Sequence, residues 1–233
     1  MYSNYFNDRV HRYPRVWSNR ELERFAAHFD GDVVNVSAWK DIDKEGRFYK
    51  DYFVNARSYS ITNYKEDLRG FQGVEGEIFL DLMADLDEDL VGRFDVVFNH
   101  TTLEHIYDFK KAFENLCLLS RDVVIVVVPF VQQMHSGYGD FWRFSPMATA
   151  QLFEEQGIDV GYLSFSSTPN SSVYVFAIGT KQPNRWKDVL PFEFGYTDPE
   201  AVLHEAPFAG CRIISEPLVF RFAQWVRKLW NGR

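Results

Sequence analysis

A group of polar and ionisable side chains follows an apolar segment near the middle of the chain. Its members are Asn99, His100, Thr101, Glu104 and His105. Amide, hydroxyl and carboxylate groups bind polar ligands, and imidazole also transfers protons near neutral pH. The chemistry to expect is therefore binding of a polar ligand, with or without proton transfer, provided that the backbone brings these side chains to one place.

The elements around this group form a β-α-β unit. Two apolar runs, residues 94–98 and 123–128, lack strict alternation, which is typical of strands buried on both faces of a parallel sheet. Between them, apolar residues recur at helical spacing at Phe109, Ala112, Phe113, Leu116 and Leu119. In open α/β sheets ligands bind at the carboxyl edge, and the first of these strands ends in the polar group.

Two motifs resemble the class I S-adenosylmethionine-dependent methyltransferases. The first is an FDVV strand, a polar turn, Leu103-Glu104-His105, a helix and a strand that ends in Val128-Pro129. The second, residues 140–146, reads DFWRFSP and is similar to the DYWRFTP signature of a type 11-like branch often associated with glycan and cell-surface biosynthesis. The motifs occur in the family's order, and the resemblance covers residues 32–180.

The resemblance implies an α/β, Rossmann-like class I methyltransferase fold. Such a fold has a mostly parallel seven-stranded sheet, helices on both faces and an antiparallel closing hairpin. The local pattern agrees, because residues 160–165 and 173–178 read as strands joined by a Ser/Pro/Asn loop. Ser145 and Pro146 predict the start of a helix that stops at Gly157.

The resemblance also implies S-adenosylmethionine as cofactor, although the first motif departs from the family's pattern. That motif has an acid and then two glycines, which let the backbone approach the cofactor closely. Here Asn35 stands in place of the acid, and Ser37 and Trp39 in place of the glycines. At the end of the second predicted strand, Asn63 replaces the acid that bridges the ribose hydroxyls, without charge-assisted hydrogen bonds.

The adenine end of the cofactor is predicted at Asp85 and Leu86, which match an Asp-Leu pair after the family's third strand. With the polar end of the central strand included, the predicted cofactor contacts are Asn35, Ser37, Asn63, Asp85, Leu86 and Asn99.

The acceptor side is expected in the loop after the strand that ends at Pro129. His135 is a candidate general base for an acceptor hydroxyl, and an exposed loop histidine is the plainer interpretation. Tyr138 and Arg143 are candidate substrate contacts. For Arg143 the alternative is a brace, in which it pairs with a carboxylate beside an aromatic plug. His105 is interpreted as bracing its turn.

The chain divides into an N-terminal arm and helix (1–31), the methyltransferase-like domain (32–180) and a C-terminal extension (181–233). The first seventeen residues form either a loose arm or a cover over the site. Ser18 and Glu21 predict a capping box at the start of the first helix.

The C-terminal extension ends in a basic amphipathic helix. Its apolar stripe consists of Leu218, Phe222, Trp225, Val226 and Leu229. This helix fits a peripheral membrane contact or a partner. Packing onto the domain, or formation of a homodimer, is the plainer interpretation.

Composition excludes several classes of protein. A net charge of −8 over 233 residues argues against a nucleic-acid partner. Two cysteines, Cys117 and Cys211, indicate neither a disulfide framework nor a metal cluster, so we expect no metal site and a reducing, cytoplasmic location. The N-terminus lacks a signal-peptide core, and the longest apolar run, 123–131, is too short to cross a membrane.

Two functions remain open. The first is methyl transfer to a hydroxyl of a small molecule or of a sugar or glycan precursor. Methyl transfer from a sulfonium needs alignment and exclusion of water, so no catalytic triad is expected. The second is a non-catalytic binding or assembly protein with a decayed cofactor site, which Asn35, Ser37, Trp39 and Asn63 favour.

Overall fold

A seven-stranded sheet is the centre of the computed structural model, which describes residues 8–65, 70–135, 137, 139–168 and 170–192. Its strand order is β3-β2-β1-β4-β5-β7-β6. Neighbouring strands from β3 through β5 are parallel, and β7 is antiparallel to both β5 and β6. The strands are β1 (Asp32–Val36), β2 (Ser58–Asn63), β3 (Glu77–Phe79), β4 (Phe94–His100), β5 (Ser120–Val131), β6 (Asp159–Phe165) and β7 (Val173–Thr180).

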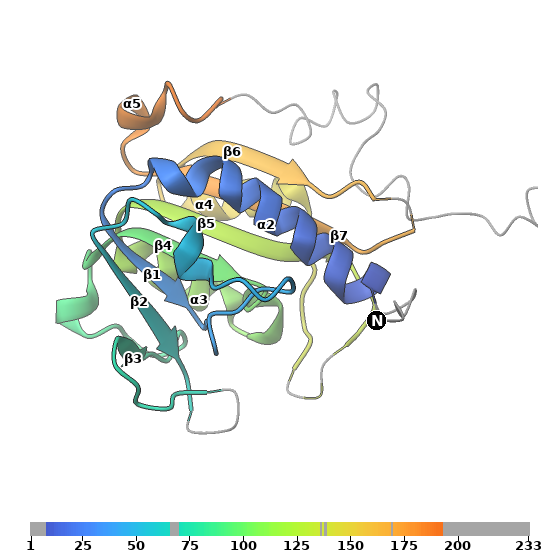
Figure 1. Cartoon of the computed structure of the whole chain (residues 1–233), viewed down its shortest axis with the longest axis horizontal. Coiled ribbons are helices and arrows are strands. Elements are labelled where there is room, and N and C mark those ends of the chain that lie inside the picture. The colour runs from blue at the N-terminus through green and yellow to red at the C-terminus, as the bar shows by residue number, and fades with distance from the viewer. Residues whose placement is uncertain (1–7, 66–69, 136, 138, 169, 193–233) are drawn as a thin grey trace, which may run out of the picture.

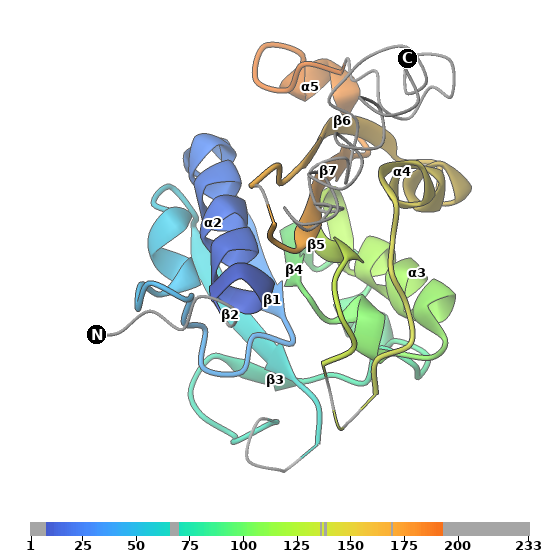
Figure 2. The ribbon, with the colours of Figure 1, turned by 90° about the vertical axis from the view of Figure 1, so that its right-hand side faces the viewer.

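Helices cover both faces of the sheet. One face carries α2 (Tyr13–Phe25), and the other carries α3 (Phe109–Leu119) and α4 (Pro146–Glu155), as Figures 1 and 2 show. The fold also has α5 (Pro183–Trp186) and the short turns η1 (Asp8–Arg12), η2 (Ala26–His28), η3 (Tyr49–Tyr52), η4 (Glu88–Leu90) and η5 (Leu103–His105). The expected architecture, a mostly parallel sheet with an antiparallel closing hairpin, is confirmed.

The central strands are buried on both sides. In β4, Val96 packs with the core under α2, and Val97 packs with the core under α3 and α4. In β5, Ile125 and Val124 divide in the same way, and all four side chains are at most 2% exposed. This double burial is the physical reason for two apolar runs without alternation.

The other predicted elements of the domain are close to their expected positions. The N-terminus of α4 is capped by Ser145, whose Oγ accepts a hydrogen bond from the Ala148 backbone N–H at 3.1 Å. The two strands of the closing hairpin, β6 and β7, pair antiparallel at the edge of the sheet.

The N-terminal segment differs from the prediction. The capping box at Ser18 is wrong, because α2 already begins at Tyr13, with Pro14 in its first turn. Ser18 lies inside the helix, where its hydroxyl donates to the Arg15 carbonyl at 2.9 Å and lies 2.8 Å from His100 Nε2. A loose arm is also wrong for residues 8–17, which are helical.

A segment without a regular helix joins β1 to β2, and two buried aspartates hold it. Asp41 accepts hydrogen bonds from Asn35 Nδ2 at 2.8 Å and from the Tyr59 hydroxyl at 2.7 Å. Asp43 accepts from Asn19 on α2 at 3.1 Å and from the Tyr52 hydroxyl at 2.7 Å. The segment is thereby fixed between α2 and the end of β1.

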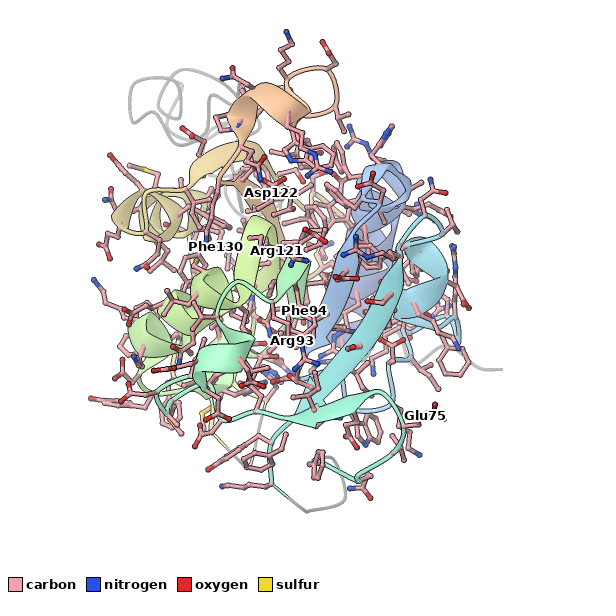
Figure 3. All side chains as sticks on the ribbon, turned by 90° about the vertical axis from the view of Figure 1, so that its left-hand side faces the viewer. Glu75, Arg93, Phe94, Arg121, Asp122 and Phe130 are labelled. Atoms are coloured by element: carbon pink, nitrogen blue, oxygen red, sulfur yellow. The ribbon has the colours of Figure 1, made fainter. Side chains whose placement is uncertain are left out.

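Ion pairs gather at the opposite, amino edge of the sheet, away from the polar strand ends. Arg121 Nη2 lies 2.9 Å from Asp95 and 3.1 Å from Asp32, and Arg57 pairs with Asp32 as well. Figure 3 looks onto this edge, where Phe94 and Arg121 lie at the start of neighbouring strands. Because these groups are solvated, we assign the cluster little stabilisation.

The described chain continues past β7. Trp186 of α5 is 5% exposed, packs with the α2-side core, and donates from Nε1 to buried Asp122 at 2.9 Å. The predicted C-terminal amphipathic helix lies outside the described residues. Among the helices that the structure does describe, none has the length and apolar character needed to cross a membrane.

Leu22 tests whether α2 belongs to the cooperative core. Its side chain is 1% exposed, so Leu22→Ala should lower the free energy of unfolding by about 2–5 kcal/mol. Arg20→Ala, on the exposed side of the same helix, should change it by less than about 0.5 kcal/mol. Urea denaturation of both variants measures the difference, and equal small effects would contradict the placement of α2.

His100 tests the contact between α2 and β4 through pH. Burial, and then the charge of Arg15, hold the pKa of His100 well below its usual range. As the pH falls below about 6.5, His100 binds a proton in the unfolded chain but stays neutral in the folded protein. Stability should therefore fall, with His100 contributing up to about 1.4 kcal/mol per pH unit.

The measurement is the slope of the free energy of unfolding as a function of pH between pH 7 and pH 5, which spans the ordinary histidine pKa of about 6.5. His100→Gln should make this slope shallower, whereas His28→Gln, at an exposed position, should leave it unchanged. The same slope in His100→Gln as in the wild type would show that this ring is not held neutral.

Candidate functional site

The order of the strands places the topological switch point of the sheet, where a crevice is expected, between β1 and β4. These two strands are neighbours, but the chain leaves β1 towards β2 on one side and leaves β4 towards β5 on the other. Ligands of open α/β sheets bind where the connections diverge in this way, outside the carboxyl ends of the strands. The loop after β1 and the turn after β4 therefore form the candidate site.

The loop after β1 has an unusual backbone. Ser37, Trp39 and Asp41 all have left-handed conformations, with φ of 59°, 51° and 57°. Residues with a side chain adopt this conformation at a cost of roughly 1–2 kcal/mol each, whereas glycine does not pay it. The loop thus has a conformation suited to glycine, although none of these three residues is glycine.

The backbone of this loop is bonded to the end of β2. The Ser37 N–H donates to Thr62 Oγ1 at 3.3 Å, and the Trp39 N–H donates to Asn63 Oδ1 at 2.7 Å. The Asn63 amide nitrogen donates back to the Trp39 carbonyl at 3.2 Å and to Glu77 at 2.6 Å. Asn63 therefore holds the loop, and the ribose contact expected of it would compete with these bonds.

The two remaining asparagines of the predicted cofactor site are buried. Asn35 is 2% exposed and donates to Asp41, so its side chain shapes the loop after β1. Asn99 is fully buried and joins the ends of β4 and β1 by donating to the Val36 carbonyl at 3.0 Å. Among the described residues, no group donates to Asn99 Oδ1, which leaves a buried acceptor at the end of β4.

The adenine contact predicted at Asp85 stays a prediction, and Asp85 lies six residues beyond the end of β3. Asp85 has a side chain 97% exposed that pairs with Lys111 of α3 at 3.2 Å. Asp81 comes two residues after the end of β3, and its Oδ1 accepts from the Met83 N–H at 2.8 Å. The sequence motif did not single out Asp81. Leu86 is partly buried against the core under α3.

The turn after β4 is contacted by the Arg15 guanidinium group of α2. Arg15 Nη2 donates to Thr101 Oγ1 at 3.2 Å, and Thr101 itself has a left-handed φ of 52°. Three residues on, Glu104 is 0% exposed, and burial raises the pKa of its carboxyl to about 8. Arg15 was missed because its segment was predicted to be a loose arm or cover, although Pro14 is a signal for a helix start there.

The two resemblance motifs contact each other. The Phe141 N–H donates to the Glu104 carbonyl at 2.8 Å, and His105 Nδ1 lies 2.6 Å from the Gly139 carbonyl. Arg143 binds both oxygens of Asp140, at 2.6 and 2.8 Å. The hydrogen bond from Arg143 lowers the pKa of Asp140 to about 2. These contacts are those of a brace, and substrate contact by Arg143 stays a prediction.

His135 lies beside this brace. Its side chain is 11% exposed, its Nδ1 is 3.4 Å from Asp140 Oδ2, and its ring centroid is 5.2 Å from that of His105. The ring of His11, from the turn before α2, is 5.6 Å away. Tyr138 lies outside the described residues. The N-terminus, the β4 turn and the loop after β5 thus bring three histidines together.

No protein-family model matches the chain, and no curated protein is similar to it in sequence. Solved structures do match. One is the 1,6-didemethyltoxoflavin-N1-methyltransferase of Burkholderia thailandensis with bound S-adenosylhomocysteine, at 17% identity and a TM-score of 0.50 over 76% of this chain and 85% of that one. Another is the magnesium protoporphyrin IX methyltransferase of Synechocystis PCC 6803 with bound S-adenosylmethionine, at 10% identity and a TM-score of 0.50 over 77% and 85%. The chain therefore has the Rossmann-like class I methyltransferase fold.

Proposed function

We propose that this protein is an S-adenosylmethionine-dependent methyltransferase that acts on a hydroxyl of a small molecule or of a sugar or glycan precursor. The observation that carries the proposal is the left-handed backbone of Ser37 and Trp39, with φ of 59° and 51°, at the crevice between β1 and β4. Strained backbone of this kind persists only where the surroundings enforce it, and it concentrates at ligand sites.

Polar groups at this edge of the sheet fit a polar cofactor. Among the described residues, no group donates to Asn99 Oδ1 at the end of β4. Asp81 follows β3 at the same edge of the sheet. When bound, S-adenosylmethionine supplies an activated methyl group, so the protein has to orient the acceptor and exclude water. The acceptor class rests on the sequence resemblance, and its proton would pass to a ring nitrogen of His135.

One observation favours the second candidate, a non-catalytic binding or assembly protein. The side-chain amide of Asn63 forms hydrogen bonds with the Trp39 backbone through both its oxygen and its nitrogen. Trp39 itself is 44% exposed. A cofactor that needed the Asn63 amide would have to displace the loop.

Calorimetric titration with S-adenosylmethionine and S-adenosylhomocysteine tests the proposal. We expect micromolar binding, on the order of 8 kcal/mol. Ser37→Val should weaken it at least about tenfold, because a β-branched side chain resists a left-handed φ. Ser167→Val, at an exposed loop position, is the matched control and should bind as the wild type does. Absence of binding in the folded wild type would favour the non-catalytic candidate.

Arg143 separates a brace from a substrate contact. The Asp140 side chain is 1% exposed, so Arg143→Ala leaves a buried carboxylate unpaired and should lower the free energy of unfolding by about 3 kcal/mol. Arg93→Ala, at an exposed position, should cost less than about 0.5 kcal/mol. An Arg143→Ala protein as stable as the wild type but unable to transfer methyl groups would make Arg143 a substrate contact.

A further inference from the structure

Three metal-ligating side chains meet at the carboxyl edge of the sheet. Glu104 and His105 come from the turn after β4, and His135 comes from the loop after β5. One ligand-type atom of each residue lies within 4.8 Å of those of the other two. The side chains of the two histidines are each 11% exposed, so the cluster borders solvent.

Among the described residues, no other residue forms a hydrogen bond with the Glu104 carboxylate. The residue is 0% exposed, and neither oxygen has a partner within the described part of the chain. Arg15 and Arg143 act on it electrostatically without bonding it. Such a carboxyl is costly to ionise, and coordination of a cation would stabilise its ionised form. Its oxygens are therefore available to a ligand that the described part of the protein does not provide.

A second layer of contacts orients the His105 ring and holds the backbone of His135. His105 Nδ1 bonds the Gly139 carbonyl at 2.6 Å, so this nitrogen carries the proton and the lone pair is on Nε2, 3.7 Å from Glu104 Oε1. Asp140, held by Arg143, accepts the His135 backbone N–H at 2.9 Å, and the His135 Nδ1 has no hydrogen bond among the described residues. The bond of His105 is typical of metal-binding histidines, in which the ring nitrogen that does not hold the metal donates a hydrogen bond.

We infer that Glu104, His105 and His135 bind a divalent transition-metal ion of the zinc type. Two imidazole nitrogens and one carboxylate oxygen suit Zn²⁺, Co²⁺ or Ni²⁺ better than Mg²⁺ or Ca²⁺, which prefer oxygen ligands. Three protein ligands leave a coordination position open, as in catalytic rather than structural sites. The cysteine count had indicated no metal site, and these residues become a ligand set only through the fold.

The use of the ion in methyl transfer rests on the proposed function. An acceptor hydroxyl in the open position would be oriented by the ion and would lose its proton more readily. A ring that holds the metal cannot also take up that proton at the same nitrogen. The metal would then replace His135 as the group that activates the acceptor.

Metal titration of the full chain, stripped with a chelator and free of any histidine tag, tests the inference. We expect one equivalent of Co²⁺ to bind with a visible spectrum of nitrogen and oxygen ligation, and Zn²⁺ to displace it. Glu104→Gln and His135→Ala should each weaken binding at least about tenfold. His28→Ala, which removes an exposed histidine elsewhere, should bind as the wild type does.

Two outcomes would overturn the inference: a folded wild type that takes up no ion, or uptake unchanged in both variants. Should Glu104→Gln fail to fold, His135→Ala decides alone. Titration of the same proteins with S-adenosylmethionine separates the two proposals. Loss of metal with retained cofactor binding supports a distinct metal site, whereas a wild type that binds metal but no cofactor contradicts only the proposed function.

Discussion

The burial of β4 and β5 on both faces is the constraint on which the rest of the structure depends. Helix α2 must cover one side and helices α3 and α4 the other, and each helix has to present an apolar stripe of its own. Polar side chains have no place along these strands and gather where the strands end. The candidate site is thus the edge at which the core stops and hydrogen-bonding groups begin.

At that edge, several polar groups are held by one another. Asn63 is bound to Trp39, Asn35 to Asp41, and Arg143 to Asp140. Such closed pairs shape loops and leave little for a ligand. The groups without a partner in the described structure, above all the Asn99 oxygen and the Glu104 carboxylate, are therefore the informative ones, because burying them unsatisfied costs free energy.

The loop after β1 shows how a strained backbone can be held by its neighbours. Ser37 and Trp39 both have a left-handed backbone, and hydrogen bonds to Thr62 and Asn63 hold it there. The cost of roughly 1–2 kcal/mol per residue is carried by the surrounding contacts. The bonds to Trp39 occupy the Asn63 amide, which the resemblance had assigned to the ribose of the cofactor.

The sequence alone predicted the β4-α3-β5 unit, the Ser145 cap and the closing hairpin, because apolar periodicity and turn residues act locally. It did not determine where α2 begins, which acid follows β3, or that Arg15 reaches Thr101. It also did not show that His135 meets Glu104 and His105, some thirty residues earlier. Only the tertiary structure decided these, because the burial of a side chain and the partners it finds depend on long-range packing that no local pattern encodes.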